Sequence, residues 1–204
     1  MPSFLFLKNH KKLKLIIFFL ILLGAVSFGV FNLLFSKAEI PPAFQQGRSQ
    51  ASLYAKEIVG LIHEISQSLR EIQNLEGKDK DAKALDIVLV QIEKNNQVRQ
   101  KAVLLAEELT KMTNAISYIR PPKVGKTALE ALSTETVLIQ RLVNYNELLS
   151  KLLTLIKDGL FSKKTDYDEI NKVVNQLNKE ADEINKLNDK FLSLIGDFDG
   201  YFLK

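Results

Sequence analysis

Apolar residues recur along most of the chain at alternating three- and four-residue steps, the spacing of a helix packed in a bundle. The clearest example follows Pro41-Pro42, which is suited to begin a helix, and ends near Gly77, which is suited to a left-handed position beyond its end. Its apolar positions are Ala51, Ala55, Ile58, Ile62, Ile65, Leu69 and Ile72.

A second helix is predicted from about Asp81 to Ile119, because Arg120-Pro121-Pro122 then disfavours helical backbone. Five polar residues, 93–97, interrupt its apolar stripe, which there loses phase. We interpret Asn95 and Asn96 as a register-setting polar layer, with a hinge or a ligand-accepting layer as the alternative. The apolar positions are Leu85, Val88, Leu89 and Ile92, then Val98, Ala102, Leu105, Leu109, Met112, Ile116 and Ile119.

Two more helices follow. Thr127 and Glu130 form a capping box for the third, which is predicted to end at a connection over 159–164, and Asp166 with Glu169 caps the fourth. The seam of the third helix is Leu138, Leu142, Tyr145, Leu149, Leu152 and Ile156. That of the fourth is Tyr167, Ile170, Val174, Leu177, Ala181, Ile184, Phe191, Ile195 and Phe198, broken only at Asn188.

These elements predict an all-α fold. No segment alternates with the two-residue period of a strand, and there is no cysteine to form a disulfide. Helices of roughly 30–40 residues with short connections bury their stripes best when neighbours are antiparallel. We predict an up-down-up-down four-helix bundle over 43–198, followed by an aromatic tail, 199–204. Surplus leucines at 148, 153 and 155 leave a homo-oligomer open.

The segment 15–35 has a different pattern: 21 residues without a charge. At 1.5 Å per residue it spans roughly 31 Å, which matches the thickness of a bilayer's hydrocarbon core. Four lysines precede it and no net charge follows, so the positive-inside rule places the N-terminus in the cytoplasm. We therefore predict a single-pass transmembrane signal anchor, with a basic cytoplasmic tail, 1–14, and a juxtamembrane linker, 36–42.

Two alternatives to the anchor stay open: a signal peptide cleaved after Ala38, and a buried helix of a soluble protein. The anchor is favoured because its apolar run exceeds the usual core of a signal peptide, and because so small a domain could not cover the helix on every side.

The formal charge of +4 does not indicate a nucleic-acid partner. Four of the 28 basic residues lie within residues 1–35, which contain no acidic residue, so the remaining 24 balance the 24 acidic residues. A neutral bundle lacks the basic face that nucleic-acid binding needs.

No motif indicates catalysis, a cofactor or a metal site. Gly125-Lys126-Thr127 resembles the end of a phosphate-binding loop, but the first glycine of that motif is replaced by Arg120 and no strand precedes it. His63-Glu64 resembles the start of a zinc-protease helix, but Gln67 stands where the second histidine is needed. We therefore expect a non-enzymatic protein without cofactors.

Two surfaces are candidates for binding. A polar stripe on the fourth helix, turned away from the apolar seam, consists of Asn171, Asn175, Asn178, Asp182, Asn185 and Asp189. Near the membrane, Arg120, Lys123 and Lys126 could contact anionic headgroups, and Tyr201 and Phe202 could rest in the interface. The alternatives there are a solvated loop and a tail packed on the bundle.

The expected function follows from the predicted membrane location and the predicted helical-bundle fold. We expect a membrane-anchored, extracytoplasmic interaction or scaffold protein of the cell envelope, with the bilayer and an envelope or membrane protein as partners. The alternative is a ligand-sensing four-helix bundle that signals through a membrane partner.

Overall fold

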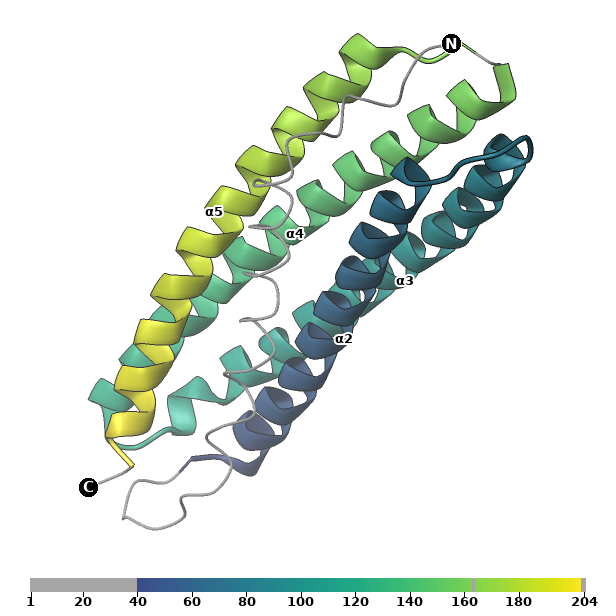
Figure 1. Cartoon of the computed structure of the whole chain (residues 1–204). Coiled ribbons are helices and arrows are strands. Elements are labelled where there is room, and N and C mark those ends of the chain that lie inside the picture. The colour runs from purple at the N-terminus through teal and green to yellow at the C-terminus, as the bar shows by residue number, and fades with distance from the viewer. Residues whose placement is uncertain (1–39, 163, 203–204) are drawn as a thin grey trace.

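The computed structural model describes residues 40–162 and 164–202. In these ranges the chain forms four long helices and no strand. The helices are α2 (Pro42–Gln73), α3 (Lys80–Ala115), α4 (Pro122–Ser162) and α5 (Tyr167–Gly200), and a short 3-10 helix, η2 (Ile116–Tyr118), follows α3. Successive helices run in opposite directions as a bundle (Figure 1). The predicted all-helical fold is confirmed.

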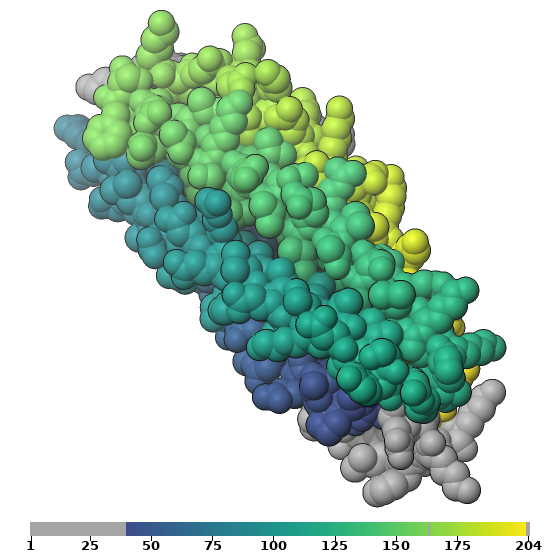
Figure 2. All heavy atoms as spheres, turned by 180° about the vertical axis from the view of Figure 1, so that it is seen from behind, coloured from purple at the N-terminus to yellow at the C-terminus, as the bar shows by residue number. Residues whose placement is uncertain are grey.

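The bundle consists of two helical hairpins. α2 packs along α3, α5 packs along α4, and α3 and α4 join the hairpins; seen from behind, α3 and α4 form one continuous surface (Figure 2). α2 and α5 have no comparable packing along their lengths. Their side chains meet near one end, where the rings of Phe44 and Phe198 are 5.5 Å apart.

The two ends of the bundle are distinct. We call proximal the end that carries the start of α2, the connection between α3 and α4, and the end of α5 (Figure 1). The distal end carries the connections 74–79 and 163–166. Gly77 in the first of these has a φ of 97°, the left-handed conformation expected from the sequence.

The predicted seams of the first and third helices are buried in full, but the seam of α3 differs from the prediction. It continues without a break through Ala84, Val88, Gln91, Asn95 and Val98, all buried. The stripe therefore keeps its phase, and two of its positions are polar. Leu89, predicted on the apolar face, is 48% exposed.

The connection between α3 and α4 is shorter than predicted. α3 ends at Ala115 and tightens into η2, and Ile119 is extended just before Arg120-Pro121. α4 begins at Pro122 rather than at Thr127, because proline at the first helical position has its φ preset and needs no amide partner. The hydroxyl of Thr127 donates to the carbonyl of Lys123, so the predicted capping box is wrong.

At the distal end, α4 continues through Gly159 to Ser162 instead of ending at Gly159. That glycine permits a close approach, since a Cβ there would lie 2.8 Å from the Thr165 hydroxyl oxygen. The predicted cap of the fourth helix is confirmed: the Asp166 carboxylate accepts a hydrogen bond from the Glu169 amide at 3.0 Å.

The surplus leucines of the third helix pack within the bundle. Leu153 is fully buried, and Leu148 and Leu155 pack against the core. They therefore give no reason to expect a dimer seam on α4.

The predicted transmembrane segment, 15–35, lies outside the described residues. Among the helices of the described part of the chain, none is both long and apolar enough to cross a bilayer.

Candidate functional site

The polar stripe on α5 lies on the flank that α4 does not cover. α5 pairs with α4 through Glu169 and Glu180, which contact Lys151 and Arg141. Of the six stripe residues, Asn178 and Asn185 are half-buried, and the exposed members are Asn171, Asn175, Asp182 and Asp189. None of the six forms a hydrogen bond or ion pair with another described residue, so their polar groups are open to a partner.

Asn95 forms a buried polar layer with Asn146 of α4. The Asn95 amide donates to the Asn146 carbonyl at 3.1 Å. The Asn146 amide donates to the Asn95 carbonyl at 2.9 Å and to its side-chain oxygen at 2.6 Å. We call this pair the asparagine layer.

Asn96 has no part in the asparagine layer, because it is exposed. α3 is also continuous through both positions, which leaves no sign of the alternative hinge. Asn146 follows the seam residue Tyr145 and lies between Leu142 and Leu149 in helical spacing. That spacing is the sequence signal that would have identified it.

The basic residues expected near the membrane lie at the proximal end. Lys123 and Lys126 are exposed on the first turns of α4, which corrects their assignment to a loop. Arg120 is exposed and donates to the carbonyl of Ser117 at 3.0 Å. Tyr118, which the sequence does not single out, is 70% exposed at the same end.

The aromatic tail packs on the bundle. α5 runs to Gly200, so the tail is not a separate segment from residue 199. Tyr201 and Phe202 are half-buried against the core, and the ring of Phe202 lies 5.1 Å from that of Phe198. The Lys123 ammonium lies 5.7 Å from the Tyr201 ring. The contacts of both rings match the packed-tail alternative better than a tail resting in the interface.

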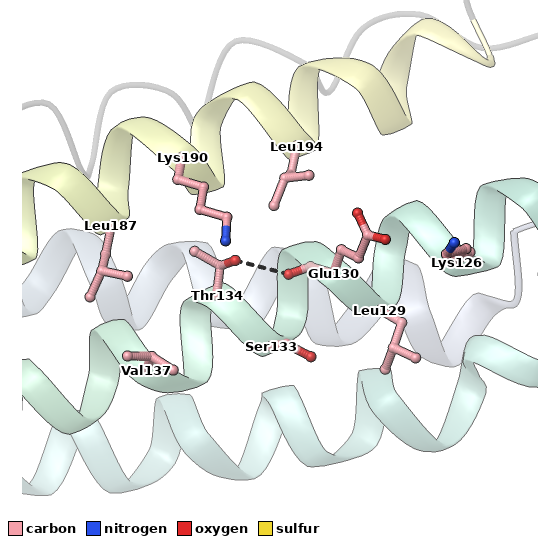
Figure 3. Close-up of a pocket in the computed structure, with 9 residues that line it drawn as sticks. All are labelled: Lys126, Leu129, Glu130, Ser133, Thr134, Val137, Leu187, Lys190 and Leu194. Atoms are coloured by element: carbon pink, nitrogen blue, oxygen red, sulfur yellow. Dashed lines mark hydrogen bonds between the residues drawn. The ribbon is translucent and has the colours of Figure 1, made fainter.

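An open groove of about 500 Å³ runs between α4 and α5 on the other flank of α5 (Figure 3). Leu187 and Leu194 point from α5 towards α4, and Lys190 reaches over the groove towards Thr134 (Figure 3). The other lining residues are Lys126, Leu129, Glu130, Ser133 and Val137. Leu129 and Val137 are 45% and 49% exposed, so the groove offers apolar surface flanked by lysines.

A second polar group lies inside the bundle towards the proximal end. Arg48 of α2 donates from both terminal nitrogens to the two carboxylate oxygens of Asp199 in α5, at 2.7 and 2.9 Å. The side chains of Arg48 and Asp199 are 29% and 11% exposed. The guanidinium also lies 5.8 Å from the Phe198 ring. This bidentate pair connects α2 and α5, which otherwise have little packing between them.

Glu135 occupies a seam position of α4, four residues after Ala131 and three before Leu138, both buried. It is half-buried and forms no hydrogen bond or ion pair with the described residues. Burial raises the pKa of its carboxyl from 4.5 to about 7, and the positive charge of Arg48 opposes that rise. The Arg48 charge therefore acts on two carboxyl groups, although its hydrogen bonds go to Asp199 alone.

Asn188 of α5 is 3% exposed, and its side-chain oxygen has no hydrogen-bond partner. It lies between Leu187 and Lys190, which line the groove together with Thr134 (Figure 3). Because Thr134 precedes Glu135, Asn188 and Glu135 lie at the same height in the bundle. We call the Arg48–Asp199 pair, together with the Glu135 carboxyl that the Arg48 charge reaches, the acceptor-rich layer. Asn188 does not belong to it, because it precedes Asp199 on α5 by eleven residues, about 16 Å along the helix axis.

Of Arg48, Glu135, Asn188 and Asp199, the apolar pattern singles out only Asn188, as the break in the apolar rhythm of its helix. Arg48 and Glu135 do not stand out, because the apolar seams of their helices become clear only from Ala51 and Leu138. Extending each seam by one helical step would have placed both side chains in the interior.

Comparisons with protein-family models, with curated proteins and with solved structures give no match to this chain.

Proposed function

We propose that this chain is a non-enzymatic interaction protein of the cell envelope, held in the membrane by residues 15–35 with its helical bundle outside the cytoplasm. The anchor holds the bundle near a membrane or envelope partner, so each contact with that partner can be weak.

The observation that carries the proposal is the uncharged 21-residue segment preceded by lysines. Its supporting context is the position of the bundle. α2 begins at Pro42, seven residues after the segment ends, and its start lies at the proximal end with the exposed Arg120, Lys123 and Lys126. An anchor entering at this end brings those cations close to anionic headgroups.

The polar stripe on α5 is the proposed partner surface. It consists of hydrogen-bonding groups without partners among the described residues, on a flank that α4 leaves uncovered. The groove between α4 and α5 adds an apolar surface on the opposite flank, suited to side chains of a partner helix.

Topology can be tested cleanly because the chain has no cysteine. Single variants Ser3→Cys and Glu76→Cys place one thiol on each predicted side of the membrane, and Glu76 is exposed at the distal end. A membrane-impermeant maleimide added to intact cells or spheroplasts should label the second variant and not the first. Labelling of Ser3→Cys, or failure to label Glu76→Cys until the cells are lysed, would contradict the anchor's orientation.

Partner binding can be tested by crosslinking in intact membranes. The triple change of Asn175, Asn178 and Asp182 to Lys should remove a specific crosslinked partner. A charge-matched control changes Gln97, Gln100 and Glu107, all exposed on α3, to Lys and should keep it. Equal crosslinking by both triple variants would exclude the stripe as the partner surface.

A ligand-sensing bundle that signals through a membrane partner is the second candidate function. The observation that favours it is Asn188 of α5, whose side-chain oxygen is buried and has no hydrogen-bond partner among the described residues.

A further inference from the structure

We propose that the proximal end of the bundle docks on the bilayer by binding the phosphates of anionic lipids through Arg120, Lys123 and Lys126, which we call the proximal cations. The docked bundle stands upright, with its distal end furthest from the membrane. This inference rests on the proposed membrane anchor and adds the chemical class of the lipid and the orientation of the bundle.

Positive charge is concentrated at the proximal end, although the chain beyond residue 35 is neutral as a whole. The stretch 109–129 contains four basic residues and no acidic residue. At the distal end, the stretch 76–83 contains three lysines that alternate with three acidic residues. These three, which we call the distal lysines, are Lys78, Lys80 and Lys83. The two ends therefore differ in charge although both contain several lysines.

The proximal cations are not neutralised within the described part of the chain. The fourth basic residue of the stretch, Lys111, contacts the Glu108 carboxylate at 2.7 Å. The proximal cations are all exposed and form no ion pair with a described residue. Their charges therefore remain available to an external anion.

Few acidic groups oppose the proximal cations. Asp199 in the last turn of α5 is already paired with Arg48. Asp197 is exposed in the same region and forms no ion pair with a described residue. The described residues of this end therefore keep an excess of positive charge, which complements a negatively charged surface.

Helix stability does not explain the position of two of these cations. The positive end of the helix dipole favours acidic residues in the first turn, and α5 has Asp168 and Glu169 there. The first turn of α4 has no acidic residue and contains Lys123, and Lys126 follows in the next turn. Because cations at this position weaken the helix slightly, an anionic partner explains them better than folding does.

The chain that leads into the proximal end identifies this partner as the bilayer. Residues 36–41 connect the uncharged segment to α2, and six residues reach at most roughly 25 Å. An anchored chain therefore keeps its proximal end close to the lipid headgroups. Tyr118 is 70% exposed at the same end, and tyrosine is enriched at the interface between membrane and water. Charge, tether and aromatic ring together favour a lipid surface.

The test uses the full chain with a fluorophore on a single cysteine, in phosphatidylcholine nanodiscs that contain a nitroxide-headgroup lipid, with or without about 30% phosphatidylglycerol. Asn114→Cys reports on the proximal end and Glu76→Cys on the distal end, and both positions are exposed. The Asn114→Cys label should be quenched several-fold more strongly in the anionic discs, and the Glu76→Cys label in neither. Equal quenching of the proximal label in both discs, or quenching of the distal label, would overturn the proposal.

Variants locate the surface. Changing all three proximal cations to Gln should reduce quenching in the anionic discs to the level of the neutral discs, since each basic side chain near an anionic surface strengthens association by about fivefold. The double variant Lys123→Gln with Lys126→Gln keeps the hydrogen bond from Arg120 to the Ser117 carbonyl, and it should lose most of the extra quenching.

The matched control changes the three distal lysines to Gln, which removes the same charge from exposed positions and should leave quenching as in the wild type. Unchanged quenching in the triple proximal variant, or an equal loss in the control, would overturn the assignment. Failure of docking is distinguishable from failure of the anchor. An anchored chain stays in the disc and keeps the predicted cysteine labelling whether or not its proximal end docks.

Discussion

Two polar layers interrupt the apolar interior of this bundle, and they differ in how well their groups are matched. In the asparagine layer two neutral amides bond to each other across α3 and α4, through three hydrogen bonds of 2.6 to 3.1 Å. In the acceptor-rich layer the Arg48 guanidinium is hydrogen-bonded to the Asp199 carboxylate, and the Glu135 carboxyl, which the same charge reaches, has no hydrogen-bond partner among the described residues.

The difference shows that a polar residue at a seam position can either fix the register of two helices or lower the stability of the fold. A matched pair fixes the register of two helices at little cost, because each buried group has its partner. An unmatched group lowers stability until something binds it. The same α-helical pattern thus contains one layer whose polar groups are matched and one that includes a carboxyl group without a partner among the described residues.

The largest expected effect comes from breaking the charge pair of the acceptor-rich layer. Arg48→Met leaves the Asp199 carboxylate largely buried without its counter-ion and should lower the free energy of unfolding by about 3–5 kcal/mol. Urea unfolding of the full chain in micelles measures this. Arg141→Met, which breaks the more exposed pair with Glu180, is the control and should cost at most about 1 kcal/mol. Equal losses in the two variants would contradict the contrast between them.

The next effect is a gain in stability that depends on pH. Because the folded-state pKa of Glu135 is raised from 4.5 to about 7, the folded protein holds this proton more tightly than the unfolded chain. Its contribution to stability is fully present below pH 4.5, falls as the pH rises to about 7 and is lost above it.

Glu135→Gln resembles the protonated form at every pH. It should therefore raise the unfolding free energy at pH 8 by at most about 3 kcal/mol and leave it nearly unchanged at pH 4.5. Unfolding free energies of both proteins across that range check this. A constant difference between them would show that Glu135 does not titrate as described.

Substitutions in the asparagine layer should change stability in a non-additive way. Asn95→Leu or Asn146→Leu alone leaves buried polar groups without partners and should cost about 1–3 kcal/mol. The double Leu variant should cost clearly less than the sum, because no unpaired amide remains. A double-mutant cycle from urea unfolding measures the coupling, and strictly additive losses would argue against the paired amides.

The smallest effect is expected outside both layers. Asn171→Ala and Asn175→Ala replace exposed residues with a better helix former and should change stability by no more than about 0.5 kcal/mol, towards greater stability. Thermal unfolding checks this. A loss above about 1 kcal/mol would mean that the polar stripe serves the fold rather than a partner.

Hydrophobic periodicity was sufficient to predict the four helices and most of their buried faces, because burying an apolar stripe is the main constraint on each helix. The periodicity did not predict where the helices begin and end. Pro122 begins α4 although Thr127 and Glu130 match a capping box, and α4 continues past Gly159, where Thr165 packs closely against that glycine. Caps and glycines depend on neighbours that the local sequence does not reveal.

The candidate sites were harder to predict, because polar residues at seam positions resemble interruptions. Asn95 and Gln91 continue the seam of α3, although the apolar residues taken alone lose phase there. Arg48 and Glu135 belong to seams on different helices, and only the fold brings the Glu135 carboxyl within range of the Arg48 charge. The exposed stripe on α5 was predictable because helical spacing alone places its members on one face.

The contrast between the two layers depends most on the claim that Glu135, half-buried at a seam position of α4, has a carboxyl group without a partner among the described residues. The pKa of its carboxyl, followed by NMR of the full chain carrying ¹³C-labelled glutamate and assigned with Glu135→Gln, tests that claim directly. We expect a pKa near 7, because burial disfavours the ionised carboxylate. A pKa near 4.5 would contradict the account.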